Sequence, residues 1–253
     1  MRNALRNGFL KIPSVGKSAV EKTCYLCGKL INKELKGRDH IPPKTIFPEH
    51  IRKKLNLSKL RWRWTHKNCN ESYGYDEEYF KLSIGASAID SPILKYVWDD
   101  LKKMARKPQT QNLRLKVYSE FISEVRTPNH IILPGVIAKT FETKRIYRVV
   151  WKIIRGLYFI EFSNILPETT PHYISYIQKD APMFSTELLT ILFHATLAQK
   201  EKGDYADIFS YWYYQTDKKD FYSWIINFWS RHPFFIFHHL PSCTCEKCSK
   251  GCS

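Results

Sequence analysis

The sequence has few acidic residues, no long apolar segment and no internal repeat. Asp and Glu number 24 against 40 Lys and Arg, which gives a formal net charge of +16 at pH 7. No segment reaches the ~18 consecutive apolar residues that a membrane-spanning helix needs. Residues 1–20 also lack the sustained apolar stretch of a secretory signal. These absences predict a protein without a membrane partner, and the missing repeats exclude a solenoid.

Cysteine is scarce as well. The chain has 7 cysteines, and their grouping near the two ends fits a reducing cytosol better than a secreted disulfide framework. We therefore expect a cytoplasmic protein.

The excess of positive charge is strongest near the N-terminus. Residues 1–80 contain 17 Lys or Arg and 8 Asp or Glu. By composition alone, such a surface suits a nucleic acid, an anionic membrane or an acidic protein. Phosphate is the natural ligand for it, and the motifs below favour nucleic acid among these partners.

Two pairs of metal-binding side chains have the spacing of a zinc site. Cys24 and Cys27 are separated by two residues, and so are His66 and Cys69. Each pair can present both ligands to one ion across a tight turn, and four sulfur or imidazole ligands complete a tetrahedral shell. We predict a structural Zn²⁺ ion at these four residues.

Residues suited to a second metal ion lie between and beside these pairs. Asp39 precedes His40, and Asn70 directly follows the last predicted zinc ligand. Carboxylate and amide oxygens suit Mg²⁺ or Mn²⁺, which complete their shells with water and substrate phosphate. A neighbouring histidine that titrates near neutral pH can deprotonate an attacking water.

These motifs together resemble an HNH endonuclease, a member of the ββα-metal superfamily. The segment Asp39-His40-Ile41-Pro42-Pro43-Lys44 is similar to the Asp-His-x-Pro-Pro-Lys signature of one bacterial branch, and residues 76–80 and 155–158 also look like that branch. The resemblance implies that Asp39 and Asn70 bind the catalytic cation and that His40 is the general base. It further implies metal-dependent hydrolysis of phosphodiester bonds, with DNA as the expected substrate. A role in antiphage defence is compatible with this chemistry, and the sequence does not decide it.

The sequence departs from the family pattern at two places. His66 replaces a cysteine, a mild change because imidazole binds zinc well. The family's middle Asn has no clear counterpart, since Lys59 stands near its place and Asn56 and Ser58 are nearby. The alternative interpretation is therefore a zinc-stabilised nucleic-acid-binding protein whose HNH motif is inactive.

Basic residues near the motif are candidates for phosphate contacts. Alternation of arginine and tryptophan over residues 60–64 predicts a strand. We expect Arg61 and Arg63 to face the phosphates while both tryptophans pack behind, and the alternative is that the arginines are merely solvated. We also expect Arg38 and Lys44 to hold a neighbouring phosphate.

The predicted fold class is α+β. It comprises a basic arm (1–20), a zinc-bracketed ββα-metal nuclease module (21–82), a helical linker and aromatic-rich α+β domain (83–240), and a cysteine-rich tail (241–253). The tail has two interpretations, a second zinc site and a flexible redox-sensitive segment. Its candidate ligands are Cys243, Cys245, Cys248 and Cys252.

Within residues 83–240, the patterns predict individual elements. Apolar spacing predicts a helix over 83–107, and a second helix is expected over 138–156, where it ends at Gly156. Strands are predicted at 113–117 and 130–133. Residues 157–240 are expected to form short strands and two helices, one of them over 185–200. The bases of the second helix form either a phosphate-binding face or an ordinary solvated face. The many aromatic residues after 157 are expected to form the core, with base stacking as the alternative.

Overall fold

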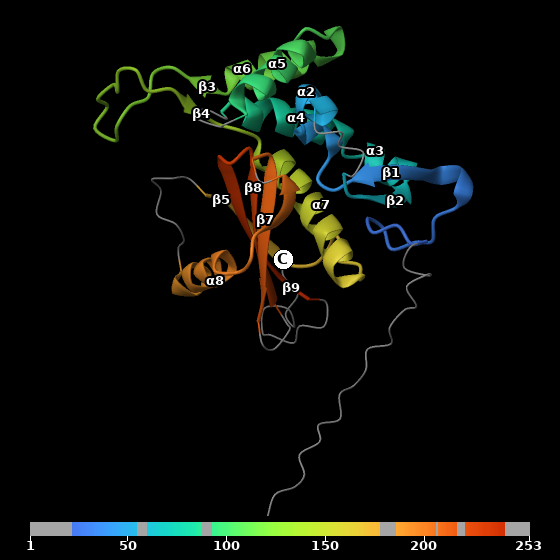
Figure 1. Cartoon of the computed structure of the whole chain (residues 1–253). Helices are drawn as coiled ribbons and strands as arrows, with labels where there is room; N and C mark the ends of the chain where they lie inside the picture. The colour runs from blue at the N-terminus through green and yellow to red at the C-terminus, as the bar shows by residue number, and fades with distance from the viewer. Residues whose placement is uncertain are drawn as a thin grey trace, which may run out of the picture.

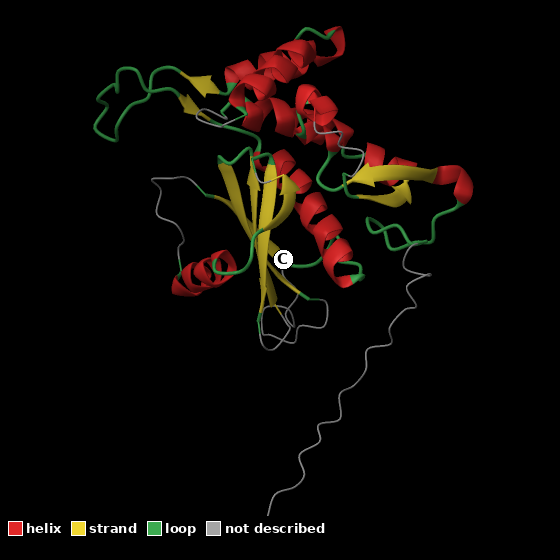
Figure 2. Cartoon of the chain, in the orientation of Figure 1, coloured by secondary structure: helices red, strands yellow, loops and turns green. Residues whose placement is uncertain are grey.

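The structure is a computed structural model that describes residues 22–54, 60–87, 93–177, 186–205, 207–216 and 221–240. It confirms a mixed α+β fold with a cysteine and histidine cluster near its N-terminal end and an aromatic-rich antiparallel sheet (Figures 1 and 2). The predicted arm, the cysteine-rich tail and the residues considered for the middle Asn (56, 58 and 59) lie outside the described residues.

A β-hairpin followed by a short helix forms the N-terminal part. Strand β1 (Lys36–His40) pairs antiparallel with β2 (Trp62–His66), and α3 (Lys67–Glu71) begins at the next residue. The strand predicted at 60–64 is thus confirmed with slightly later bounds. The 3-10 helices η1 (Lys33–Leu35) and η2 (Lys44–Ile46) flank β1, and α2 (Glu49–Lys54) lies between the two strands in the chain.

The next segment is more helical than predicted. It contains α4 (Gly74–Gly85), α5 (Leu94–Ala105), η3 (Pro108–Thr110) and α6 (Gln111–Ser119). The helix predicted over 83–107 is confirmed only for Leu94–Ala105, and its predicted start is wrong because α4 ends at Gly85 and α5 begins at Leu94.

The strand predicted at 113–117 is also wrong. Leu113 and Val117 are four residues apart and both pack inward from α6, whereas Leu115 is 56% exposed. Leu113 and Val117 share one face of the helix because they are four residues apart. The alternating apolar pattern is therefore also compatible with a helix.

The strand predicted at 130–133 is a loop. It lies between the two-residue strands β3 (Phe121–Ile122) and β4 (Ala138–Lys139), and only the isolated bridge between Arg126 and Ile132 is formed there. Its apolar side chains remain exposed, so the loop lacks the packing that supports a strand.

The C-terminal half is a five-stranded antiparallel sheet in the order β5-β9-β8-β7-β6. Its strands are β5 (His172–Tyr176), β6 (Lys202–Tyr205), β7 (Phe209–Gln215), β8 (Phe221–Phe228) and β9 (His232–His239). Both faces are buried, because Trp224 and Ile226 belong to the main core while Ile225 between them belongs to a second cluster. The predicted use of these aromatic residues as core is confirmed.

A helix covers each face of this sheet (Figure 1). Helix α8 (Glu187–Leu197) packs with Ile225 and Phe235 on one face, which confirms the helix predicted at 185–200. Helix α7 (Thr143–Phe162) packs on the other face, where Tyr158 contacts Tyr222. None of the helices within the described residues is long and apolar enough to cross a membrane.

Helix α7 differs from its predicted bounds of 138–156. It begins five residues later and continues through Gly156 to Phe162. A Cβ atom at position 156 would lie 2.8 Å from the Ile41 side chain, so this glycine permits close packing and does not end the helix. Helix α7 therefore lies between the sheet and the β1–β2 hairpin (Figure 1).

Candidate metal centre and polar cluster

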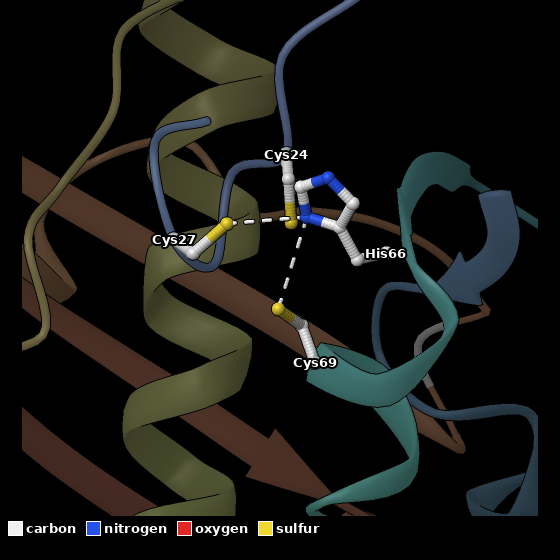
Figure 3. A group of neighbouring side chains, drawn as sticks. All are labelled: Cys24, Cys27, His66 and Cys69. Atoms are coloured by element: carbon white, nitrogen blue, oxygen red, sulfur yellow. Dashed lines mark hydrogen bonds between the residues drawn. The ribbon is translucent and has the colours of Figure 1, made fainter. Parts of the chain in front are cut away.

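Four side chains from three separate segments converge near the N-terminal end of the described chain. Ligand atoms of Cys24, Cys27, His66 and Cys69 all lie within 4.8 Å of one another, and Figure 3 shows the sulfur atoms and the imidazole pointing toward a common centre. The first two come from a tight turn in which Gly28 has φ +74°, a conformation that glycine adopts without strain. The other two come from the end of β2 and from α3.

The geometry of His66 fits a zinc ligand. Its Nε2 lies 3.0 Å from the Leu30 carbonyl oxygen, which only accepts, so Nε2 carries the hydrogen and Nδ1 has a free lone pair. Nδ1 lies 3.2 Å from Cys27 Sγ and 3.9 Å from Cys69 Sγ. Ligand atoms of a tetrahedral zinc site are roughly 3.3–3.8 Å apart, so only small shifts are needed for coordination.

Electrostatics in the cluster also favours a cation. Burial raises the pKa of the Cys24 thiol, and burial together with the nearby Cys24 raises the pKa of Cys69 to about 12. Thiolates this close together repel each other, and a divalent ion removes that repulsion. The predicted Cys24, Cys27, His66 and Cys69 site is therefore consistent with structural Zn²⁺.

A second cluster is centred on Lys152 of α7. Its Nζ donates to Asp39 Oδ1 at 3.0 Å, to Asn70 Oδ1 at 2.7 Å and to Glu77 Oε1 at 2.6 Å. The side chains of Lys152 and Asp39 are only 1% and 3% exposed. The structure thus brings Asp39 and Asn70 together, as the sequence predicts, but around an ammonium group.

Two further residues complete the surroundings of Asp39. Burial, with Asp39 nearby, raises the pKa of Tyr25 well above its usual value, so its hydroxyl stays protonated and donates to Asp39 Oδ2. Burial raises the pKa of Glu77, and the Lys152 ammonium opposes this shift.

The oxygen donors of this cluster suit a divalent ion chemically, but the ion does not fit the cluster as it stands. A metal ion bound by Asp39, Asn70 and Glu77 would need the position that Lys152 Nζ occupies. Mg²⁺ or Mn²⁺ binding at Asp39 and Asn70 stays a prediction.

The candidate base His40 is the last residue of β1 and is half-buried. Burial lowers its pKa, and the positive charge of Lys44 lowers it further. Among the described residues, no hydrogen bond engages its imidazole. A neutral imidazole with a free lone pair is the form that a general base requires.

The prediction that Trp62 and Trp64 pack behind the arginines is wrong. Trp62 and Trp64 are half-buried and stack edge to face at 5.0 Å, and the Arg38 guanidinium lies 4.9 Å from the Trp62 ring. The strand register pairs His40 with Trp62, so this face also carries the candidate base. The tryptophans therefore lie on the face of β1 that carries Arg38.

Arg61, which directly precedes β2, and Arg63 in β2 both contact other protein groups. Arg61 donates to the Tyr211 hydroxyl at 3.0 Å and lies 3.8 Å from Glu161, and Arg63 donates to the Trp62 carbonyl oxygen. Lys44 is exposed in η2. The binding of nucleic acid by Arg38, Lys44, Arg61 and Arg63 stays a prediction.

Four of the five bases of α7, including Lys152, have partners within the described residues. Arg145 and Arg148 both pair with Asp76, while Arg155 is 1% exposed and donates to the carbonyl oxygens of Leu26 and Leu166. The sequence predicts that these bases either bind phosphate or are solvated. The structure shows them in contact with other protein groups.

Sequence reasoning did not assign site roles to Lys152, Glu77 or Tyr25. A partial signal exists, because Glu77 lies within the family-like segment 76–80 and Lys152 precedes the segment 155–158 by one helical turn. No local pattern reveals that these residues meet Asp39, since Lys152 and Asp39 are 113 residues apart.

Comparisons of the chain with protein-family models, with curated proteins and with solved structures found no match. The functional assignment therefore depends on the residues and their geometry.

Proposed function

We propose that this protein is a zinc-stabilised HNH-type endonuclease that hydrolyses phosphodiester bonds of nucleic acid, with DNA as its substrate. The observation that supports this most is the convergence of Asp39 and Asn70 on one atom, at 3.0 Å and 2.7 Å, with Asp39 directly preceding His40 in a β-hairpin followed by a helix. The cysteine and histidine cluster would hold α3 against the 24–27 turn and so fix Asn70 relative to Asp39.

In this proposal His40 acts as the general base. Its imidazole takes a proton from water, the water oxygen attacks phosphorus, and the bond from phosphorus to the 3′ oxygen breaks. The leaving oxygen takes a proton from solvent, which gives a 5′ phosphate and a 3′ hydroxyl. The lowered pKa keeps the imidazole neutral near pH 7.

Positive groups on the same face would hold the substrate. Arg38 lies over Trp62 and Trp64, and exposed Lys44 follows His40 by four residues. Together they offer two charges for the phosphates that flank the scissile bond. The Mg²⁺ or Mn²⁺ ion that the sequence predicts at Asp39 and Asn70 would have to compete with Lys152 for the same oxygens.

The second candidate function is a zinc-stabilised nucleic-acid-binding protein without hydrolytic activity. The observation that favours it is that the Lys152 ammonium already satisfies Asp39 and Asn70. It predicts binding to DNA without cleavage under any metal condition.

Cleavage of plasmid and single-stranded DNA by zinc-loaded protein tests the proposal, with Mg²⁺, with Mn²⁺ and without added divalent ion. We expect His40→Ala to lower the rate by about 10²-fold or more, the typical contribution of a general base. His194→Ala is the matched control, because His194 is exposed on α8, across the sheet from α7. Cleavage by His40→Ala at the wild-type rate would refute the assignment, and DNA binding without cleavage by the wild type would favour the second candidate.

A further inference from the structure

An internal ammonium group occupies the place that a metal ion would take in the polar cluster. Lys152 Nζ has three N–H donors, and its three acceptors are Asp39, Asn70 and Glu77 at 2.6–3.0 Å. The ring of Tyr73 lies 5.1 Å from the same Nζ and adds a cation–π contact. No donor remains for water or phosphate, so Lys152 orients the cluster and does not touch a substrate.

The spacing of the cluster oxygens leaves room for one cation between them. Asp39 and Glu77 contribute two carboxylates and Lys152 one ammonium. A divalent ion bound to the same oxygens would lie about 2.1 Å from each of them. It would then overlap with Nζ, which is 2.6–3.0 Å from those oxygens. Binding of the metal ion therefore requires Lys152 to leave.

The surrounding structure holds Lys152 in place. It lies in the middle of α7, and its side chain is 1% exposed. Three residues later, Arg155 fixes the helix by donating to the carbonyl oxygens of Leu26 and Leu166, and Gly156 packs directly against Ile41. Withdrawal of the ammonium would leave the buried Asp39 carboxylate without its cation, which is unfavourable.

We propose that Lys152 is the resident cation of the Asp39, Asn70 and Glu77 cluster. It positions Asp39 and Asn70 in place of a divalent ion and excludes Mg²⁺ and Mn²⁺ from these oxygens. The inference goes beyond the proposed nuclease function and predicts that hydrolysis at His40 proceeds at the same rate with and without added Mg²⁺.

Binding of Mn²⁺ tests this directly, because bound Mn²⁺ loses the six-line electron paramagnetic resonance signal of the free ion. The samples are zinc-loaded wild type, Asp39→Asn, Lys152→Met and the double variant Lys152→Met/Asp39→Asn. Lys95→Met is the matched control, since Lys95 is exposed on α5. We expect no Asp39-dependent Mn²⁺ binding in the wild type or the control, a new site in Lys152→Met, and its loss in the double variant.

The comparison of Mn²⁺ binding between the wild type and Asp39→Asn tests the inference even if Lys152→Met does not fold. Mn²⁺ bound by the wild type and lost in Asp39→Asn would overturn the inference. A folded Lys152→Met protein that binds no additional Mn²⁺ would overturn it as well. Because the readout is metal binding, a wild type that neither cuts DNA nor binds Mn²⁺ would refute the nuclease proposal and support this inference.

Discussion

At the scale of single residues, the contact between Gly156 and Ile41 fixes how closely α7 approaches the hairpin. We expect Gly156→Ala to destabilise the protein, because its Cβ would lie 2.8 Å from the Ile41 side chain. Overpacking costs about 1–3 kcal/mol, and the better helix propensity of alanine offsets up to about 1 kcal/mol. Urea denaturation of zinc-loaded protein measures the difference.

Gly74→Ala is the matched control for this prediction. Gly74 begins α4, and a Cβ atom there would meet no atom within 4 Å. We expect an unchanged or slightly higher free energy of unfolding for this variant. Equal stability of the two alanine variants would show that α7 and the hairpin are less tightly packed than the structure indicates.

At the scale of elements, the cysteine and histidine cluster connects the 24–27 turn to β2 and α3. We expect Cys27→Ser to lose the zinc ion of this cluster and to lower the melting temperature by roughly 10 °C or more. A structural zinc site contributes several kcal/mol, and each kcal/mol corresponds to about 2–4 °C for a protein of this size. Metal analysis and thermal melting of the same preparation measure both effects.

Ser72→Ala serves as the control for the cysteine variant. Ser72 follows α3 directly, and its hydroxyl donates to the Cys69 carbonyl oxygen at 2.9 Å without belonging to the cluster. We expect it to keep the zinc content of the wild type. A Cys27→Ser protein with wild-type zinc content would contradict the assignment of this ligand.

At the scale of the whole molecule, one hydrophobic core extends from Cys24 near the hairpin to Ile236 in β9. The boundary predicted between residues 82 and 83 falls inside α4, and α4 packs against α7. The division into a nuclease module and a separate domain stays a prediction. The shared core means that α7 and the sheet support the polar cluster of the hairpin.

This core contains two buried histidines that make stability depend on pH. Burial lowers the pKa of His232 and of His238 to about 3, whereas an unfolded histidine titrates near 6.5. Between these values the unfolded chain binds protons that the folded protein does not bind, so stability falls as pH drops below about 6.5. The loss approaches about 1.4 kcal/mol per pH unit for each histidine.

His238→Gln tests the pH dependence. Glutamine can still accept the hydrogen bond that Trp224 Nε1 donates to His238 Nε2 at 3.0 Å, but it does not titrate. Urea denaturation between pH 7.5 and 5.0 should therefore give a shallower loss of stability than in the wild type. Acid release of zinc affects both proteins alike, so identical slopes would indicate that His238 has the same pKa in the folded and unfolded states.

The sequence by itself determined the features that depend on neighbours in the chain. The two-residue spacing within Cys24–Cys27 and within His66–Cys69 is consistent with the zinc site that the structure supports, and alternation identified β2. A helix is likewise expected over 185–200, where the structure forms α8. The same local patterns misplaced α6, because alternation over five residues also fits one helix face.

Only the tertiary structure decided what surrounds Asp39. Lys152 of α7 donates to this carboxylate and also to Asn70 of α3 and Glu77 of α4. Whether a lysine becomes a solvated charge or a buried cation depends on which acceptors the fold places around it, and a one-dimensional pattern does not encode those distances. For the same reason, Gly156 suggested a helix end in the sequence and proved to be a packing contact in the folded protein.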